Sequence, residues 1–448
     1  MYYILFITAF VSGLLANTIH VPGDYLTIQD AINNSSDGDS ILVQPGNYIE
    51  NLNNHAKTIH IVSTDLDNPE NTVIDGNFEG SVVYFWDGAP SLNGFKLING
   101  LGTTFQDQLH GAGIMVGSNQ NFYNLIISNS SENSSSVIFS SANDRSRFYN
   151  VKVVNNPTTA IRQHLGLGML FYDCIFNNNS SVLSNWGGQP EFERCLIYNN
   201  ESGLDSFAAC TIQIHNSTIA YNEYHPLSAA EGSNFHIYNS IIWGHSEPIH
   251  LSSGDNPTIY MRYSLYNGGP EFYDISNLVS NFTFDVDETN IFQDPLFLDS
   301  SNNNFFLQPI SPCIDTGNPN SPLDLDGTTA DMGAYYFDQI ETPIGCTDEF
   351  AINFNEEADF DDGSCEYSEN GDYSLSFDGV DDFVNCGNNS SLNVQDSFTV
   401  QVMVNVNSIG WWNGIVSKNT STNLGWWIGT ADESYDNLPE RIAFGGYK

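Results

Sequence analysis

One six-residue pattern of apolar and polar positions recurs eight times between Leu92 and Tyr266, at intervals of 21 to 30 residues. In each copy the first position is a large apolar residue, the fourth and sixth are apolar or small, and the third is usually asparagine, aspartate or glycine. The copies begin at Leu92, Phe122, Phe148, Phe171, Phe192, Ile214, Ile237 and Met261. A repeat of this length built from short strands is typical of a solenoid, in which each copy adds one turn.

The spacing of the apolar positions predicts two short strands and a tight corner in every copy. Positions four and six lie two residues apart, as on one face of a strand, whereas position one lies three residues before position four. The chain must therefore turn at position three, where Gly94 and Asn124 tolerate left-handed backbone angles and Arg194 and Tyr263 are exceptions. Because the period is too short for a crossover helix, the sequence predicts an all-β, right-handed parallel β-helix solenoid.

Stacking of the copies would align equivalent inward residues in buried ladders. The first position predicts a pile of phenylalanine rings, at Phe122, Phe148, Phe171 and Phe192. The fourth position predicts a column of small side chains, at Cys174, Cys195, Ser217, Ser240 and Ser264. Cys174 and Cys195 occupy neighbouring rungs, so they are either two buried thiols or a disulfide.

The outward fifth position is more apolar than a solvated face should be. Five copies place an aliphatic residue there, at Ile126, Ile175, Leu196, Ile241 and Leu265. Exposed apolar strips often mark contact surfaces. The alternative is a covering segment from this chain, for example the stretch around Tyr273 to Asn290.

Both flanks of the repeats resemble known β-helix proteins. Residues 25–32 predict a short amphipathic helix, and with residues 38–50 they resemble the N-terminal cap and first coil of pectin-lyase-like β-helix proteins. Residues 294–297 (Asp-Pro-Leu-Phe), 307–317 and 331–335 (Asp-Met-Gly-Ala-Tyr) resemble the closing segment of secreted bacterial β-helix proteins of the choice-of-anchor type. The resemblance implies a capped β-helix over residues 17–337.

A short acidic module follows a linker at residues 338–345. Residues 346–367 contain Cys346 and Cys365, which we expect to pair in an exported protein. The segment is similar to a two-Cys module of large exported bacterial surface proteins. Asp359, Asp361 and Asp362 offer the oxygen ligands that calcium prefers, and the alternative is a disulfide-closed spacer without metal.

Residues 373–448 resemble the opening strands of a laminin-G/concanavalin-like lectin domain. Alternating stretches begin at Leu375, Phe398 and Gly414. Complete sandwiches of this kind are about twice as long, so we expect an incomplete β-sandwich (jelly roll) and a truncated chain.

Composition narrows the possible partners. Eleven basic against 54 acidic residues give a formal charge of −43, which excludes nucleic acid and anionic membranes as partners. Residues 1–16 are apolar and end at a small residue, as in a secretory signal peptide, and no other stretch is long and apolar enough to be a transmembrane segment. We therefore expect a secreted or cell-surface protein, and a monomer. Cys210, Cys313 and Cys386 have no evident partners.

Candidate chemistry lies in the segments between the copies. A polar strip recurs there at about the repeat length: Asp144, Arg145, Arg162, His164, Asn185, Trp186, Asp205 and Glu231. Arg162, His164 and Asp205 are candidates for a catalytic cation, base and acid. Trp186, Asp144 and Arg145 are candidates for carbohydrate binding. The alternative is that the strip is an ordinary solvated face.

The sequence leaves three functions open. We favour a carbohydrate-binding or adhesive extracellular protein whose partners are glycans or polysaccharides. The first alternative is a polysaccharide lyase or glycoside hydrolase that acts on acidic polysaccharides, although the sequence motifs of known enzymes with this fold are absent. The second alternative is a structural stalk. Calcium is the one cofactor that the sequence suggests.

Overall fold

The structure is a computed structural model that describes residues 16–141, 145–269, 273–275, 279–340, 343–358, 360–361, 363–366, 384, 413–419, 425–431 and 441–447. The chain forms two units, Met1–Glu369 and Asn370–Lys448. The predicted signal peptide lies outside the described residues, apart from Ala16. Among the described residues, no helix is long and apolar enough to cross a membrane.

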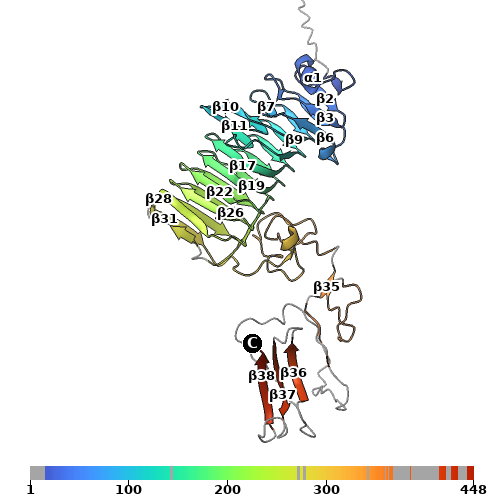
Figure 1. The fold of residues 1–448 in the computed structure, drawn as a ribbon, viewed down its shortest axis with the longest axis vertical. Helices are drawn as coiled ribbons and strands as arrows, with labels where there is room; N and C mark the ends of the chain where they lie inside the picture. The colour runs from blue at the N-terminus through green and yellow to red at the C-terminus, as the bar shows by residue number, and fades with distance from the viewer. Residues whose placement is uncertain are drawn as a thin grey trace, which may run out of the picture. The chain divides into compact units, whose positions relative to one another are not determined.

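The first unit is a parallel solenoid whose turns each contribute strands to three stacks (Figure 1). Stack 1 contains β1 (Thr18–Val21), β2 (Ser40–Val43), β5 (His60–Ser63), β8 (Ser91–Asn93), β13 (Asn121–Tyr123), β16 (Arg147–Tyr149), β18 (Leu170–Tyr172), β20 (Glu191–Glu193), β23 (Thr211–His215), β26 (Asn234–Tyr238), the second half of β28 (Ile249–Arg262) and β31 (Val279–Val286).

Stacks 2 and 3 follow stack 1 within each turn. Stack 2 contains β3 (Gly46–Ile49), β6 (Thr72–Asp75), β9 (Lys96–Ile98), β14 (Ile126–Ser128), the first halves of β17 (Lys152–His164) and β19 (Ile175–Trp186), β21 (Leu196–Tyr198), β24 (Thr218–Ala220), β27 (Ile241–Trp243) and β29 (Leu265–Tyr266). Stack 3 contains β4 (Leu52–Asn53), β7 (Val83–Phe85), β12 (Ile114–Val116), β15 (Ile138–Ser140), the second halves of β17 and β19, β22 (Ser202–Phe207), β25 (Leu227–Ala230), the first half of β28 and β30 (Tyr273–Ile275).

The corner between stacks 1 and 2 is the predicted left-handed turn. All eight third-position residues have a positive φ, from 46° at Asn216 to 86° at Gly94. Arg194 (φ 51°) and Tyr263 (φ 48°) adopt the same angle although their side chains disfavour it. The geometry of the stack therefore overrides local preference at those two corners, at a cost of roughly 1–2 kcal/mol each.

The predicted ladders lie inside the solenoid. Ring centroids along the phenylalanine pile are 4.8, 4.9 and 5.1 Å apart, and all four side chains are buried. In the column of small residues, each serine accepts the amide N–H of the rung before it, as Ser217 does from Cys195 at 3.0 Å. Cys174 and Cys195 are free thiols, which decides between the two alternatives for this pair.

A second buried ladder, which the sequence analysis did not anticipate, lines the corner between stacks 2 and 3. It consists of Asn156, Asn179, Asn200, Asn222 and His245. The side-chain amides of the first three asparagines each donate to the next rung and to a main-chain carbonyl, as Asn200 does to Asn222 (2.9 Å) and to Phe176 (3.0 Å). At the last step the main-chain N–H of Asn222 donates to Nδ1 of His245 at 3.2 Å. These side chains satisfy main-chain groups that strand pairing does not reach.

The N-terminal end is capped by α1 (Ile28–Asn34), close to the predicted helix. Ile28, Ala31 and Ile32 are buried in the solenoid core. The carboxylate of Glu50 accepts the amide N–H groups of Ile28 (2.9 Å) and Gln29 (2.8 Å) at the start of the helix. The first turns of the solenoid therefore hold the cap by both its apolar face and its free N–H groups.

The residues that resemble a closing segment cover the outer face of stack 2. Phe297, Phe305, Leu307, Cys313, Met332 and Phe337 form one buried cluster with Leu196, Ile241 and Leu265. Main-chain bonds support the contact, for example from the amide of Gly333 to the carbonyl of Asn239 at 2.8 Å. Within this segment, β32 (Phe297–Asp299), η2 (Ser300–Asn302) and β33 (Asn304–Leu307) form a small hairpin.

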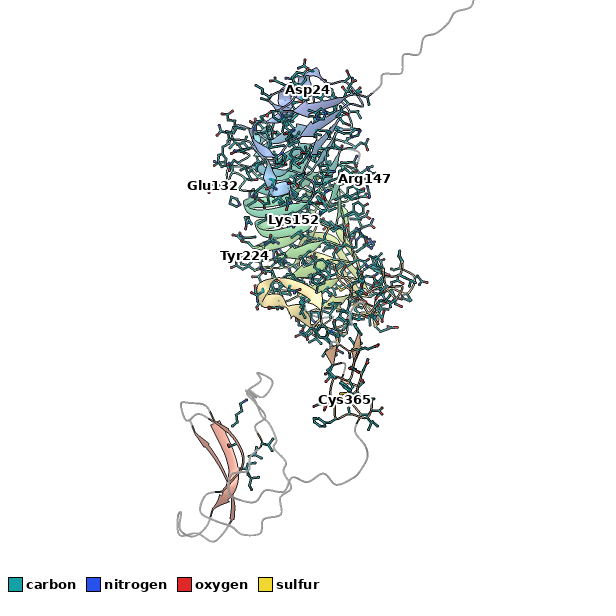
Figure 2. The ribbon with its side chains drawn as sticks, turned by 90° about the vertical axis from the view of Figure 1, so that its right-hand side faces the viewer. Asp24, Glu132, Arg147, Lys152, Tyr224 and Cys365 are labelled. Carbon is teal, nitrogen blue, oxygen red and sulfur yellow. A yellow bond between two sulfur atoms is a disulfide. The ribbon has the colours of Figure 1, made fainter. Side chains whose placement is uncertain are left out.

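This arrangement explains the apolar fifth position from Ile175 to Leu265, whereas Ile126 lies outside the covered cluster. It also corrects one prediction. The stretch Tyr273 to Asn290 does not cover stack 2, because β30 and β31 continue stacks 3 and 1 instead. The cover comes from residues 297–337. Figure 2 shows Lys152, a fifth-position residue of stack 2, with Arg147 towards one edge of the solenoid and Tyr224 towards the other.

Two short elements lie outside the stacks. The 3-10 helix η1 (Pro69–Asn71) precedes β6. A hairpin of β10 (Thr103–Phe105) and β11 (Gln108–His110) is inserted between stacks 2 and 3 of one turn.

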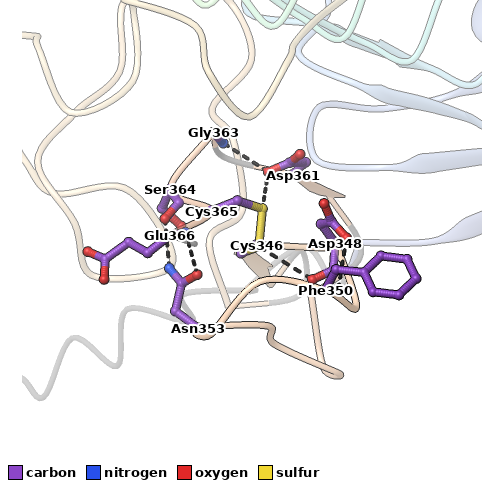
Figure 3. The surroundings of a disulfide bond; sticks show 9 residues. All are labelled: Cys346, Asp348, Phe350, Asn353, Asp361, Gly363, Ser364, Cys365 and Glu366. Atoms are coloured by element: carbon purple, nitrogen blue, oxygen red, sulfur yellow. Dashed lines mark hydrogen bonds between the residues drawn. A yellow bond between two sulfur atoms is a disulfide. The ribbon is translucent and has the colours of Figure 1, made fainter. Parts of the chain in front are cut away.

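The predicted two-Cys module contains the expected disulfide between Cys346 and Cys365 (Figure 3). β34 (Ile344–Gly345) pairs with β35 (Phe360–Asp361) beside it. Asp361 accepts the amide N–H of Gly363 at 3.0 Å. Asp359 and Asp362 lie outside the described residues, so the calcium hypothesis stays a prediction.

In the second unit, the structure describes one antiparallel sheet. It consists of β36 (Asn413–Asn419), β37 (Gly425–Ala431) and β38 (Arg441–Tyr447), in that order. β36 coincides with the strand predicted from Gly414. The other two predicted strands and Cys386 lie outside the described residues.

Candidate functional site

The outer face of stack 3 gathers most of the predicted site residues. Strand register places nine outward residues in one column: Tyr84, Met115, Phe139, Arg162, Ser184, Asp205, Ser228, His250 and Asp274. His164, Trp186 and Phe207 form a second column two residues further along their strands. Arg162, His164, Trp186 and Asp205 therefore share one face.

The remaining predicted residues lie elsewhere. Arg145 forms an ion pair with Glu191 (3.1 Å), a residue of β20 in stack 1. Asn185 points inward and is fully buried, with its amide against Gly188 and Cys210. Asp144 lies outside the described residues.

A cavity of about 240 Å³ lies at Arg162. Its lining comes from the hairpin and from the outer face of stack 3: Phe105, Gln106, Gln108, His110, Phe139, Arg162, His164 and Trp186. The cavity thus combines three aromatic rings with one guanidinium, two imidazoles and two amides.

Arg162 is the unusual charge of this cavity. Its partial burial lowers its pKa. Within the described part of the chain it forms no ion pair, whereas Arg145, Arg194 and Arg262 each pair with a carboxylate. Arg147 has no carboxylate partner there either, but its guanidinium donates to the carbonyl of Arg145 at 3.3 Å. In a chain with 54 acidic residues, a partly buried guanidinium without a carboxylate is a candidate anchor for an anionic ligand.

The two histidines of the cavity differ in their surroundings. His110 is 4% exposed and bonds through Nδ1 to the hydroxyl of Ser135. Burial, with the charges of Arg162 and His164, lowers the pKa of His110 to about 4, so this imidazole is neutral at pH 7. Nδ1 of His164 is buried and finds no hydrogen-bond partner among the described residues.

Beside the cavity lies an aromatic platform. The rings of Trp186 and Phe207 stack at 4.8 Å with an interplanar angle of 23°. Trp186 is 41% exposed, and its indole N–H donates to Ser184 at 3.2 Å, which fixes the ring. An immobilised, exposed aromatic ring offers the apolar surface on which a sugar ring stacks.

Further along the face, Asp205 belongs to a network of acids and histidines. His225 Nε2 lies 3.1 Å from Asp205 and its Nδ1 lies 3.9 Å from Glu247. Burial disfavours the charged imidazole, but these two carboxylates outweigh it and raise the pKa of His225. His250 stacks near His225 at 5.8 Å and pairs with Asp274 at 3.1 Å.

A larger groove of about 540 Å³ follows the corner between stacks 2 and 3. Its lining is dominated by the side chains of asparagines at that corner, with Glu201, Glu223 and Tyr221. No basic residue lines it. The groove therefore lacks the cation that distinguishes the Arg162 cavity.

Sequence reasoning missed the hairpin, His110 and the His225 network. His225 and His250 follow Asp205 by 20 and 45 residues, close to one and two repeat lengths, so the period carried a signal for them. The hairpin residues had no such signal, because an insertion does not follow the repeat.

A comparison with protein families agrees with the fold. A family model described as a right handed beta helix region matches residues 112–268, which confirms the predicted hand. Similar solved structures include the pectate lyase Pel9A, with 13% identity and a TM-score of 0.42, covering 72% of this chain and 97% of that chain. No curated protein matches the sequence.

Two further structures are similar. A pectin methylesterase from Aspergillus niger has 14% identity and a TM-score of 0.32, covering 62% of this chain and 86% of that chain. A mannuronic acid specific family 6 polysaccharide lyase from human gut microbiota has 11% identity and a TM-score of 0.26, covering 61% and 88%. At these TM-scores the likenesses carry no argument about chemistry.

Proposed function

We propose that this protein is an extracellular carbohydrate-binding protein whose stack 3 face binds an acidic polysaccharide. The observation that carries the proposal is Arg162, a partly buried guanidinium without a carboxylate partner among the described residues, in a cavity walled by aromatic rings. A uronate carboxylate satisfies such a guanidinium through two parallel hydrogen bonds. The disulfide supports an exported protein.

The neighbouring aromatic platform favours a sugar chain over a small anion as the ligand of this face. Trp186 and Phe207 offer stacked ring surface next to the cavity, and Asp205 and His225 offer acceptor and donor groups one rung further on. A chain that ran along this face would meet a cation, then an aromatic surface, then hydroxyl-binding groups.

The net charge of −43 gives the proposal a distinctive salt dependence. At low ionic strength the protein as a whole repels an anionic chain, because the screening length is about 30 Å at 0.01 M salt. At 0.15 M it falls to about 8 Å, so the local contact with Arg162 dominates. Affinity for a uronate chain should therefore rise as salt increases over this range.

The test is calorimetric titration of the full chain with hexagalacturonate, hexamannuronate and the uncharged cellohexaose. We expect a uronate to bind and Arg162→Met to lower its affinity at least about tenfold, equivalent to about 1.4 kcal/mol. Arg194→Met is the matched control, because Arg194 pairs with Asp173 at a corner away from the cavity, and it should bind normally. Absence of binding to both uronates, or equal binding by Arg162→Met, would contradict the proposal.

Cleavage of the bound chain is a second candidate, favoured by the contact between Asp205 and His225. An imidazole whose pKa is raised by carboxylates keeps its proton to a higher pH than a free imidazole does, and it can deliver that proton to a leaving sugar oxygen. Incubation with both uronate polymers, followed by assays for unsaturated and for reducing ends, tests this candidate. Product that Asp205→Asn abolishes supports it, and intact polymer under all conditions leaves binding alone.

A further inference from the structure

One end of the stack 3 face is closed. Met115 and Phe139 stand in the same outward column as Arg162, so their side chains point away from the core. Met115 is nevertheless 2% exposed and Phe139 1% exposed. Something outside the stack must cover these two rungs.

The cover is the hairpin of β10 and β11. Phe105 contacts Phe139 at 5.1 Å between ring centroids, and His110 contacts the same ring at 4.4 Å. Phe105 also lies 6.3 Å from Trp86 on the rung before. Gln106 and Asp107 form a left-handed two-residue turn, which is the turn that matches two twisted strands.

The hairpin is fastened on both of its strands. The hydroxyl of Thr103 bonds to Ser81 at 2.8 Å, and His110 bonds to Ser135. These contacts hold it over the face as a wall rather than as a loose loop.

From Arg162 to Asp205 the face is open. Arg162, Ser184 and Asp205 are partly exposed, and Trp186 is more exposed still. The hairpin supplies Phe105, Gln106, Gln108 and His110 to the cavity at Arg162. The open face therefore begins at a closed end, and this end contains the guanidinium of Arg162, which has no carboxylate partner among the described residues.

We propose that the protein recognises the end of an acidic polysaccharide, with the terminal uronate in the cavity at Arg162. This proposal rests on the proposed function. The cavity, at about 240 Å³, is smaller than the roughly 300–1,000 Å³ of typical ligand pockets, so it holds little more than a terminal sugar. The following sugars lie over Trp186 and Phe207 and run towards Asp205. An internal stretch of polymer cannot reach Arg162, because the hairpin blocks its passage towards Phe139.

The test compares chain lengths at equal uronate concentration. The full chain is titrated with hexagalacturonate and with long polygalacturonate, and the same pair of mannuronates. A protein that recognises chain ends finds one site on each polysaccharide molecule, whatever its length. Its apparent affinity per uronate therefore falls in proportion to the length of the polysaccharide. A protein that binds internal stretches shows equal or higher affinity for the polymer.

A hairpin variant sharpens the test. Replacement of residues 104–109 by two glycines should remove the wall and raise the apparent affinity for the polymer towards that for the hexamer. Phe105→Ala is the milder variant if the replacement exposes too much of Phe139. Dependence on Arg162 should persist in both.

The outcomes separate the two proposals. Binding of hexamer and polymer with equal affinity per uronate overturns end recognition and leaves the proposed function standing. Binding of neither overturns the proposed function. If the hairpin variants do not fold, the chain-length dependence of the natural protein still decides.

Discussion

The outer faces of stacks 2 and 3 both carry apolar residues, but they differ in how much of each face is covered by other parts of the chain. On stack 2, Leu196, Ile241 and Leu265 are buried beneath the closing segment. The buried cluster that they form with it extends over successive rungs. On stack 3, Met115 and Phe139 are covered by the hairpin, and the cover stops at Arg162. The two faces therefore differ in how far their covers extend, and on stack 3 the cover ends beside Arg162.

An outward residue of a solenoid contributes differently when it is fully covered and when it lies at the edge of a cover. An apolar outward residue that is fully covered contributes to stability, as Ile241 does at 1% exposure. A charged or aromatic residue at the edge of a cover contacts the covering segment on one side and solvent on the other. Arg162 and Trp186 occupy such a boundary, and both line the cavity proposed to bind a uronate.

Loss of one ring from the cover of stack 2 should produce the largest effect. Phe305 is 2% exposed and contacts Tyr198 at 5.0 Å and Phe297 at 5.2 Å. Phe305→Ala should lower the free energy of opening of residues 297–337 by about 3–5 kcal/mol, measured by hydrogen exchange. The adjacent Phe306 is 50% exposed, and Phe306→Ala should cost much less. Equal effects of the two variants would contradict the role given to this cover.

The same cover should weaken as pH rises. Asp331 is 3% exposed, and its burial raises its pKa to about 7 although Phe337 and Asp315 donate amide hydrogen bonds to it. Because the folded pKa exceeds the unfolded value of 3.8, the folded state binds more protons, and stability falls between about pH 4 and pH 7.

The slope for one such group is at most about 1.4 kcal/mol per pH unit. Hydrogen exchange of residues 297–337, corrected for the intrinsic rate at each pH, measures it. Asp331→Asn should flatten the profile, leaving a smaller slope in the same direction from Asp324, whose pKa burial also raises. A profile that rises with pH in the natural protein would be inconsistent with this account.

The open face should gain stability when its charge is removed. Arg162→Met keeps most of the side-chain volume and removes a partly buried charge that has no carboxylate partner among the described residues. The free energy of opening of β17 should therefore rise by about 0.5–1 kcal/mol. Hydrogen exchange of β17 is the measurement. Arg194→Met serves as the control, since it breaks the pair with Asp173 and should give no gain.

The smallest expected effect is a change in one titration. Asp205→Asn removes a carboxylate 3.1 Å from His225 and should lower the pKa of that imidazole, as followed by NMR. Asp274→Asn is the control, because Asp274 pairs with His250 and should affect His225 less. An unchanged pKa in Asp205→Asn would separate Asp205 from the histidine network.

The repeated parts of the molecule could be predicted because the repeat itself encodes them. The left-handed corners, the phenylalanine pile from Phe122 to Phe192 and the shared face of Arg162, Trp186 and Asp205 all follow from the period and the alternation of side chains. Residues that lie one repeat apart in the sequence lie next to one another on adjacent turns of the solenoid. No further information was needed.

The parts outside the repeat could not be predicted in the same way. The cover over stack 2 was assigned to Tyr273–Asn290 because this stretch follows the last copy directly, whereas its residues continue the stacks. Arg145 was placed with Arg162 by its distance along the chain, but it turns towards Glu191. The lengths of corners and insertions vary from turn to turn. The repeat period alone therefore cannot predict which face of the solenoid a residue outside the repeated strands lies on.

The uniform corner between stacks 1 and 2 has a consequence for how such a molecule can grow or shrink. Because each of the eight copies presents the same left-handed bend and places its inward side chains at the same positions, adding or deleting a whole turn joins two compatible surfaces. A single added residue within a strand would instead exchange its inward and outward side chains and expose the phenylalanine pile. A solenoid of this kind therefore tolerates a change of length in complete turns far better than a change of one residue within a strand.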